Sequence, residues 1–177
     1  GDKQREGDCQ GSLGRAYGKL GQADKSIEYL ELALSIAREI GDRQQQSMWL
    51  GSIGEAYGAL GEYHKAIEHY EQALEIALEI DDRHLECEWH NQFGGLYIRT
   101  NDAVQAKENL EQALMISREL GFRELEAKGL FNFAKLFQLE NNKESALQYA
   151  KDARAIFESI ESPELEKVNQ FIESLNQ

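Results

Sequence analysis

The sequence contains little proline and cysteine, no excess of basic residues and no long hydrophobic segment. One proline among 177 residues argues against a loop-rich all-β protein and favours helices. Cys9 and Cys87 are too few for a disulfide framework and fit a reducing compartment, so we expect a cytoplasmic protein. No apolar stretch approaches the roughly 18 residues of a membrane-spanning helix, and no signal-peptide pattern is present. We therefore expect neither a membrane protein nor a disulfide-rich secreted domain.

The charge of the chain is strongly acidic. It has 19 Lys and Arg residues against 32 Asp and Glu residues, which gives a net charge of −13 at pH 7. A nucleic-acid binder needs a basic stripe that neutralises phosphates and releases counterions. The composition therefore predicts no binding to nucleic acid or to an anionic membrane surface. It bears on the choice of partner rather than on the fold.

The sequence repeats with a period of 40 residues. Four units, 1–40, 41–80, 81–120 and 121–160, align without insertions and are followed by a tail, 161–177. The matched columns hold residues of one kind: Leu13, Ile53, Phe93 and Phe133; Tyr17, Tyr57, Tyr97 and Phe137; Ala33, Ala73, Ala113 and Ala153; Ile36, Ile76, Ile116 and Ile156. Repeats of this length indicate a solenoid, in which each unit buries its apolar face against its neighbours.

Each unit has the pattern of two amphipathic helices, at about positions 3–20 and 23–40 of the unit. In the second unit, Ile53 and Tyr57 share one helical face, and Gly61 then marks a helix end because Gly is favoured there. Asp42 and Asp102 each lie three residues before a Gln, which is the spacing of a capping box. The sequence therefore predicts helix pairs with a helix start after each of these aspartates.

The tail has the pattern of a single further helix. Ser162-Pro163-Glu164 combines a capping residue, a Pro in the first turn and an acid beside the helix dipole. An apolar stripe follows at Leu165, Val168, Ile172 and Leu175. We expect 161–177 to be a polar-faced capping helix of the solenoid. The N-terminus has no such cap, since Gly1-Asp2-Lys3 matches the hinge Gly41-Asp42-Arg43, and we expect a fragment of a larger protein.

These motifs resemble the tetratricopeptide repeat (TPR) family. The motif residues are Leu13-Gly14-x-Ala16-Tyr17 in the first unit, and Ile53-Gly54-x-Ala56-Tyr57, Gly61-x-Tyr63-x-x-Ala66-Ile67, Tyr70 and Ala73-Leu74 in the second. The 40-residue period is similar to the variant of spindle-orientation adaptors and bacterial multidomain signalling proteins. The resemblance covers residues 1–160 and implies an all-α, right-handed superhelical solenoid of four helix-turn-helix units plus the C-terminal capping helix. It also implies a concave groove, lined by the first helix of each unit, that binds peptides or helices.

The candidate groove residues lie on the first helices, opposite to core positions 13 and 17. They are Arg15, Met48, Ser52, Glu55, Glu88, Asn91, Gln92, Lys128, Phe131, Asn132 and Lys135. We expect an acidic residue of the partner near Lys128 and Lys135 and an apolar anchor near Phe131 or Met48. Phe131→Ala should then weaken binding without changing the melting temperature. A merely solvated face is the alternative.

The family's two-carboxylate clamp for chaperone C-termini is absent from this face. The clamp uses Lys and Asn at the positions matching 11 and 15 of each unit. The pairs at those positions are Gly11 and Arg15, Gly51 and Glu55, Asn91 and Gly95, and Phe131 and Lys135. We therefore do not expect a chaperone co-factor.

Glycines and tryptophans on the first helices leave two alternatives open. Gly11, Gly18, Gly51 and Gly58 lie on the groove face, where each costs roughly 0.5–1 kcal/mol relative to Ala. Either a partner's backbone approaches there, or neighbouring first helices pack tightly. We expect Trp49 and Trp89 to be buried between units. An exposed anchor at the groove rim is the alternative, since Trp is enriched at binding hot spots.

The sequence carries no convincing catalytic or metal-binding constellation. His84, Cys87 and His90 recur every third residue of one helix, and this spacing spreads the side chains around the axis instead of converging them. No Gly-rich phosphate loop follows a strand, and no carboxylate pair is marked by a cleft. We therefore predict no enzymatic activity, no cofactor and no metal.

The predicted function is a non-enzymatic protein–protein interaction module that binds a peptide or helix of a partner in the groove. The alternative is an assembly or sensor segment of a multidomain signalling protein that acts through end-to-end repeat packing. In that case, self-association through the uncapped N-terminal repeat is expected. A helical-repeat RNA reader is a third hypothesis, which the acidic charge opposes.

Overall fold

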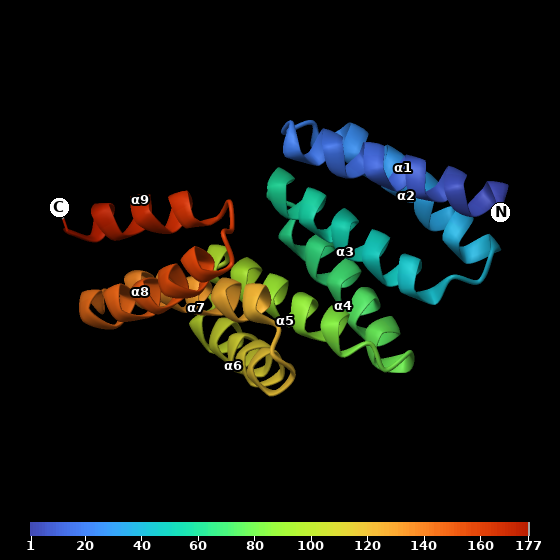
Figure 1. Cartoon of the computed structure of the whole chain (residues 1–177). Coiled ribbons are helices and arrows are strands. Elements are labelled where there is room, and N and C mark those ends of the chain that lie inside the picture. The colour runs from blue at the N-terminus through green and yellow to red at the C-terminus, as the bar shows by residue number, and fades with distance from the viewer. Residues whose placement is uncertain (177) are drawn as a thin grey trace. The chain divides into compact units, whose positions relative to one another are not determined.

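A computed structural model describes residues 1–176 and folds them into α-helices joined by short turns (Figure 1). The helices are α1 (Asp2–Lys19), α2 (Ala23–Glu39), α3 (Arg43–Leu60), α4 (Tyr63–Glu79), α5 (Arg83–Arg99), α6 (Ala103–Leu120), α7 (Arg123–Leu139), α8 (Lys143–Ser159) and α9 (Leu165–Asn176). The described residues contain no strand. The predicted all-α fold of consecutive helix pairs is confirmed, and the observed helix ends lie within about one residue of the expected ones.

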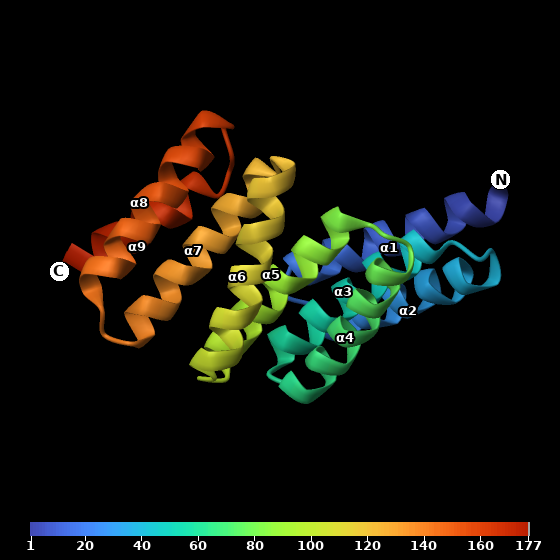
Figure 2. The same cartoon turned by 90° about the horizontal axis from the view of Figure 1, so that it is seen from below.

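The helices form two compact bodies, residues 1–89 and the residues from His90 onward, with the division inside α5. In the first body α1 packs on α2, α2 on α3 and α3 on α4. In the second body α6 packs on α7, α7 on α8 and α8 on α9 (Figure 2). Each of these helices therefore packs on the one before it in the chain, as the repeat pattern predicts.

Small residues allow the two helices of a pair to approach closely. Ala33, Ala73 and Ala113 are fully buried. A Cβ atom added to Gly14 would lie 2.6 Å from Cγ of Leu30, so α1 can contact α2 at this point only without a side chain. Such close packing brings the apolar faces together, and their burial is the main stabilising contribution to the fold.

One residue expected in the core is instead exposed. Ile53 and Phe133 of the repeated aliphatic and aromatic column are 0% and 3% exposed, whereas Leu13 of the same column is 46% exposed. Ile53 is buried because the α1–α2 pair precedes α3 and α2 packs on it. Among the described residues, no helix covers the corresponding face of α1.

The N-terminal caps of two helices form as the sequence predicts. Oδ1 of Asp42 accepts a hydrogen bond from the backbone N–H of Gln45 at 3.0 Å, and Oδ1 of Asp102 accepts one from Gln105 at 3.1 Å. The Gln45 amide group does not complete a capping box. Its Nε2 donates instead to Oδ1 of Asp8 at 2.6 Å, which links α3 to α1.

The tail helix begins at Leu165, two residues later than the signal Ser162-Pro163-Glu164 predicts, and these residues form a turn before it. The hydroxyl oxygen of Ser162 accepts a hydrogen bond from the backbone N–H of Glu164 at 3.2 Å, and α9 follows from Leu165. Its apolar stripe joins the core of the second body, where Val168 is fully buried and Ile172 is 9% exposed. The helix therefore covers one side of the last helix pair.

The turns place one residue in the left-handed backbone region. Gly occupies this position at Gly21, Gly41, Gly61 and Gly121, but Asp81, Asn101, Asn141 and Glu161 occupy it elsewhere with φ of 55°, 62°, 59° and 52°. The backbone N–H of the following residue then bonds to the carbonyl five residues earlier, as from Ser162 to Phe157 at 2.9 Å. This hydrogen bond closes the helix end in the same way as in the C-terminal helix motif that usually has Gly at the left-handed position.

Glu161→Gly is expected to stabilise the protein by about 0.5–1 kcal/mol. A non-Gly residue costs roughly 1–2 kcal/mol in the left-handed region, and the greater freedom of Gly in the unfolded chain offsets part of the gain. Urea unfolding measures the difference. Asn141→Gly is the matched control and should give a smaller gain, because Asn tolerates this region better. A loss of stability in Glu161→Gly would contradict the strain assignment.

Candidate functional site

The eleven candidate groove residues differ widely in exposure. Arg15 and Glu55 are exposed; Met48, Ser52, Glu88, Gln92, Lys128, Asn132 and Lys135 are half-buried; Asn91 and Phe131 are buried. The last two depart from the expected exposed face, since only 5% of Asn91 and 9% of Phe131 is accessible. Both side chains are held by neighbouring helices, and this packing decides what the face can offer to a partner.

In the first body, tight packing between neighbouring first helices explains Gly11 and Gly51, whereas Gly18 faces Ser26 of α2. A Cβ added to Gly11 would lie 2.3 Å from Cη2 of Trp49, and a Cβ added to Gly51 would lie 2.1 Å from Cη2 of Trp89. The expected burial of both tryptophans is confirmed, since Trp49 is 5% and Trp89 is 4% exposed. Gly11 and Gly51 therefore each make room for the indole ring of the next first helix.

The second body reverses this arrangement of large and small residues. Position 9 of the fourth unit is Gly129, and position 11 of the preceding unit is Asn91. A Cβ added to Gly129 would lie 3.0 Å from Oδ1 of Asn91. At each of these contacts, position 11 of one unit faces position 9 of the next unit, and one of the two residues is small while the other is large. Neither position alone reveals this pairing in the sequence. It becomes visible when position 11 of each unit is compared with position 9 of the unit that follows.

Buried polar groups beneath the tryptophan of α5 satisfy one another. Nε1 of Trp89 donates a hydrogen bond to Oγ of Ser47 at 2.9 Å, and Ser47 donates to the carbonyl of Ala73 at 2.7 Å. Ser47 is fully buried. The serine hydroxyl therefore connects the indole ring to α4 and leaves no unsatisfied donor at this contact.

In the second body, three side chains of α5 and α7 form a connected polar chain. Asn91 donates from Nδ2 to the carbonyl of Leu125 at 3.0 Å, and Asn132 donates from Nδ2 to the carbonyl of Asn91 at 3.3 Å. Nζ of Lys135 then donates to Oδ1 of Asn132 at 3.1 Å. Oδ1 of Asn91 is buried and accepts no hydrogen bond from any described residue.

The ammonium group of Lys135 lies over an aromatic ring. Its Nζ is 4.2 Å from the centroid of Phe131, and the ring of Phe171 meets Phe131 edge-on with centroids 5.3 Å apart. Burial lowers the pKa of Lys135 below its usual value, while the carboxylate of Glu164 acts in the opposite direction. Phe131 is therefore a platform for Lys135 rather than an open apolar anchor.

The two lysines expected to act together have different surroundings. Nζ of Lys128 lies 2.7 Å from Oε1 of Glu124 and already has a carboxylate partner. Lys135 forms no ion pair with any carboxylate of residues 1–176. Glu164, which influences its pKa, is itself paired with Lys167 at 2.9 Å. Of these two lysines, only Lys135 therefore carries a partly buried positive charge without a carboxylate of the described residues in contact.

The remaining titratable residues are not arranged for metal binding. Cys87 is fully buried, and a ring nitrogen of His90 lies 2.9 Å from Oδ1 of Asn109. The described residues contain no group of three His, Cys, Asp or Glu side chains that could hold a metal ion.

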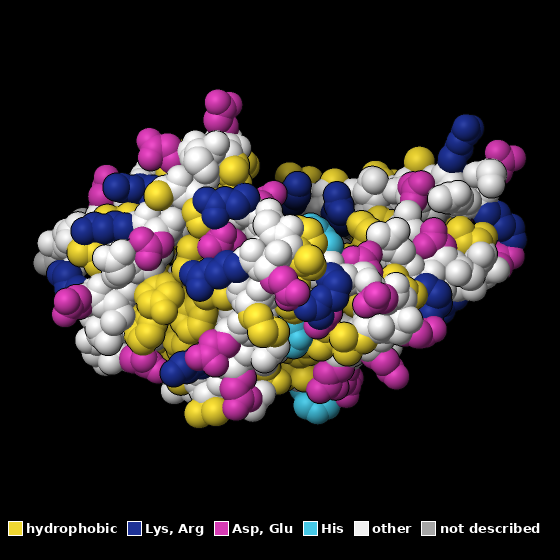
Figure 3. All heavy atoms as spheres, turned by 60° about the horizontal axis from the view of Figure 1, so that its bottom comes forward, with side chains coloured by type: hydrophobic (Ala, Val, Ile, Leu, Met, Phe, Trp, Pro, Cys, Tyr) yellow, Lys and Arg dark blue, Asp and Glu magenta, His cyan; other side chains and the backbone are white. Residues whose placement is uncertain are grey.

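Lys and Arg side chains are mixed with Asp and Glu on the face shown in Figure 3. Among the described helices, none has the length and hydrophobicity required to cross a bilayer.

A family model described as tetratricopeptide repeat matches residues 9–79 and 85–159. These two segments together contain most of the chain, and each ends close to the end of a second helix of a pair, α4 or α8. None of the curated proteins matches the sequence.

Solved structures of low sequence identity share the fold. BtubC from P. vanneervenii has 21% identity and a TM-score of 0.73, and the match covers 88% of this chain and 64% of that one. A Rap protein complexed with competence and sporulation factor has 18% identity and a TM-score of 0.87, covering 96% and 48%. A signal transduction ATPase with a tetratricopeptide repeat sensor from Pyrococcus horikoshii has 20% identity and a TM-score of 0.74, covering 89% and 24%. The chain thus spans only part of each of these proteins.

Proposed function

The chain belongs to the tetratricopeptide repeat family, and from this premise we propose that it is a non-enzymatic module for protein–protein interaction. It binds a peptide or helix of a partner in the groove lined by the first helices of the pairs. Two comparisons support a role in recognition, because one similar protein was solved with competence and sporulation factor and another carries its repeats as a sensor. We place the protein in the cytoplasm, since Cys9 and Cys87 are both free thiols.

Lys135 is the observation that carries this proposal. Its ammonium group is half-buried, lies against the Phe131 ring and has one hydrogen bond to a neutral amide oxygen. A lysine has three donors, and withdrawing its charge from water is unfavourable unless a partner compensates. A carboxylate of a bound segment would supply that compensation. We therefore propose that the partner presents an aspartate or glutamate to Lys135.

Lys135→Met is expected to weaken binding of a selected peptide by tenfold or more. Methionine preserves the apolar contact with Phe131 but removes the charge, and a hydrogen bond to a charged group is worth about 1.5–3 kcal/mol. Peptides selected by the chain from a displayed random library should be enriched in acidic residues. Calorimetry on one of them then measures the affinity.

Lys128→Met is the matched control for this experiment. It removes an equal charge from the same helix, but Lys128 is already paired with Glu124, so its affinity should change less than twofold. Equal affinity of the Lys135→Met variant and the unaltered chain would contradict the proposed contact. Selection of no peptide at all would contradict groove binding.

A second candidate function is end-to-end assembly through α1. Leu13 and Ala16 of α1 are exposed, whereas Ile53 and Ala56 at the same positions of α3 are buried. Such an apolar face can associate with another copy or with other repeats, as expected of an assembly or sensor segment. Sedimentation equilibrium tests the self-association. A monomer at every concentration would contradict it.

A further inference from the structure

One glycine of the second body lies inside a helix without a packing reason. Gly95 is a half-buried residue of α5. Outside α5, a Cβ added to it would have one atom within 4 Å, Nδ2 of Asn132 at 3.6 Å, which is an ordinary contact distance. The fold would therefore accept a side chain at this position, and Ala is favoured over Gly in a helix interior.

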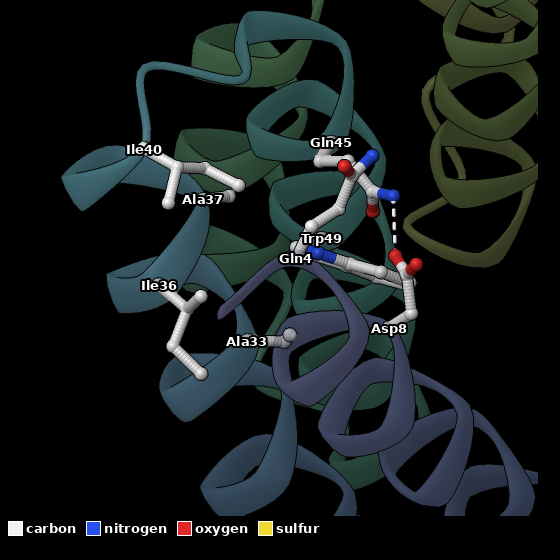
Figure 4. A pocket seen from close by; sticks show the side chains of 9 residues that line it. Gln4, Asp8, Ala33, Ile36, Ala37, Ile40, Gln45 and Trp49 are labelled. Carbon is white, nitrogen blue, oxygen red and sulfur yellow. Dashed lines mark hydrogen bonds between the residues drawn. The ribbon is translucent and has the colours of Figure 1, made fainter. Parts of the chain in front are cut away.

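Most other glycines inside helices are crowded by a neighbouring helix. Each of the four glycines of α1 would place an added Cβ at 3.2 Å or less from an atom of another helix. The same holds for Gly51, Gly54, Gly94 and Gly129. Gly7, for example, lines a small pocket of the first body together with Ile36 (Figure 4), and its added Cβ would lie 3.1 Å from Cγ2 of Ile36. Packing within the chain thus explains these glycines but not Gly95.

The surroundings of Gly95 combine an apolar side chain with a positive charge. Ile98, about one turn further along α5, is half-buried and packs on the core of the second body. On α7, Oδ1 of Asn132 accepts a hydrogen bond from Nζ of Lys135 at 3.1 Å, while Nδ2 of the same amide lies beside Gly95. The open backbone of Gly95 and the ammonium group of Lys135 are therefore separated by one side-chain amide.

A helix suits this face better than an extended peptide. An extended backbone needs hydrogen-bond partners along its length. Both polar atoms of the Asn132 amide already have partners, which are the carbonyl of Asn91 and the ammonium group of Lys135. A helix satisfies its own backbone groups except at its ends. Two helices approach closely only where the residues at the contact are small, and Gly95 is such a residue on one side.

We propose that a partner helix packs directly on Gly95, with a Gly, Ala or Ser of its own at the contact. An Asp or Glu three or four positions away on that helix then reaches Lys135, because one helical turn advances about 5.4 Å. The inference rests on the proposed function for the acidic contact with Lys135. It adds the size of a second contact residue and its spacing from the acid.

A displayed library of helix-forming peptides, randomised on one face, tests the spacing. We expect the selected peptides to combine a small residue with an acidic residue three or four positions away. One of these peptides is then added to protein labelled with nitrogen-15 at glycine. The amide signal of Gly95 should shift saturably in NMR spectra, whereas the signal of Gly121, which ends α6, should not respond.

Gly95→Leu is expected to weaken binding of the selected peptide by about tenfold or more, because the new side chain holds the two helices apart. Gly95→Ala should weaken it by about fivefold although it stabilises the folded chain. Opposite effects on affinity and on stability distinguish a partner contact from a folding defect. Gln112→Leu is the control, since it adds the same side chain to an exposed position of α6 and should change the affinity less than twofold.

Two results would overturn the inference and leave the proposed function intact. The first is unchanged affinity of both Gly95 variants for a peptide whose binding still depends on Lys135. The second is selection of Lys135-dependent peptides that lack a small residue at the expected spacing. Selection of no peptide would contradict both proposals. Urea unfolding confirms that each variant is folded, and Gly95→Ala keeps the test decisive should Gly95→Leu fail to fold.

Discussion

Phe131→Ala is expected to lower the free energy of unfolding by about 3–4 kcal/mol, the range for truncating a buried phenylalanine. Only 9% of this side chain is accessible, and its ring packs edge-on against Phe171 of α9. The same cluster contains Val168 and Ile172, so truncation would leave a cavity where α9 packs on the second body. It would also remove the ring that lies against Lys135.

Thermal unfolding measures this effect as a fall of the melting temperature by roughly 10 °C for a chain of this size. Phe131→Leu is the matched control and should cost less than about 1.5 kcal/mol, because it keeps most of the buried volume. An unchanged melting temperature, as the sequence alone predicts for a groove residue, would contradict the burial of Phe131. The variant is therefore unsuited to testing partner binding, for which Lys135→Met is the cleaner change.

Gly51→Ala is expected to destabilise the first body by about 2–3 kcal/mol, near the upper end of overpacking penalties. The new Cβ would lie 2.1 Å from Cη2 of Trp89, and an indole ring is rigid, so either the ring or a helix must move. The hydrogen bond from Trp89 to Ser47 would be strained by such a shift. These costs exceed the gain in helix propensity of roughly 1 kcal/mol that Ala has over Gly.

Gly95→Ala provides the contrasting control for Gly51→Ala. Gly95 also lies inside a first helix, but its added Cβ would meet only Nδ2 of Asn132, at 3.6 Å, an ordinary contact distance. This variant should therefore be stabilised by about 0.5–1 kcal/mol. In urea unfolding, the two alanine variants should shift the transition in opposite directions. A second substitution, Trp89→Leu, should reduce the cost of Gly51→Ala, and strictly additive effects would argue against direct contact.

Local sequence signals predict much of the fold. Asp42 and Asp102 cap their helices by hydrogen bonds to the residue three positions later, and Ser162 closes the turn that precedes α9. Gly61 and Gly121 end helices with a left-handed residue. Each of these features depends on a few neighbouring residues and on backbone geometry, which a single sequence contains. The repeat period then predicts which helices form pairs.

Features that depend on contacts between units are less accessible to sequence analysis. Leu13 and Ile53 occupy the same position in their repeat units, yet Leu13 is exposed and Ile53 is buried. They differ because α2 of the preceding helix pair packs on α3, which carries Ile53. Helical periodicity places Phe131 on the expected groove face, but Phe171 from α9 covers its ring. The position of a residue on its own helix does not reveal what another helix brings to it. The binding role of this face remains a prediction.

The opposing small and large residues of positions 11 and 9 impose an order on the repeats. Duplicating the second unit would keep Gly51 opposite a tryptophan, so the array could lengthen there by recombination without a steric penalty. If the fourth unit followed the first directly, Gly11 would face Gly129 and leave a void. If the second unit followed the third, Asn91 would be forced against Trp49. The units are similar in sequence but cannot be permuted freely, and this limits both gene rearrangement and the design of shortened versions.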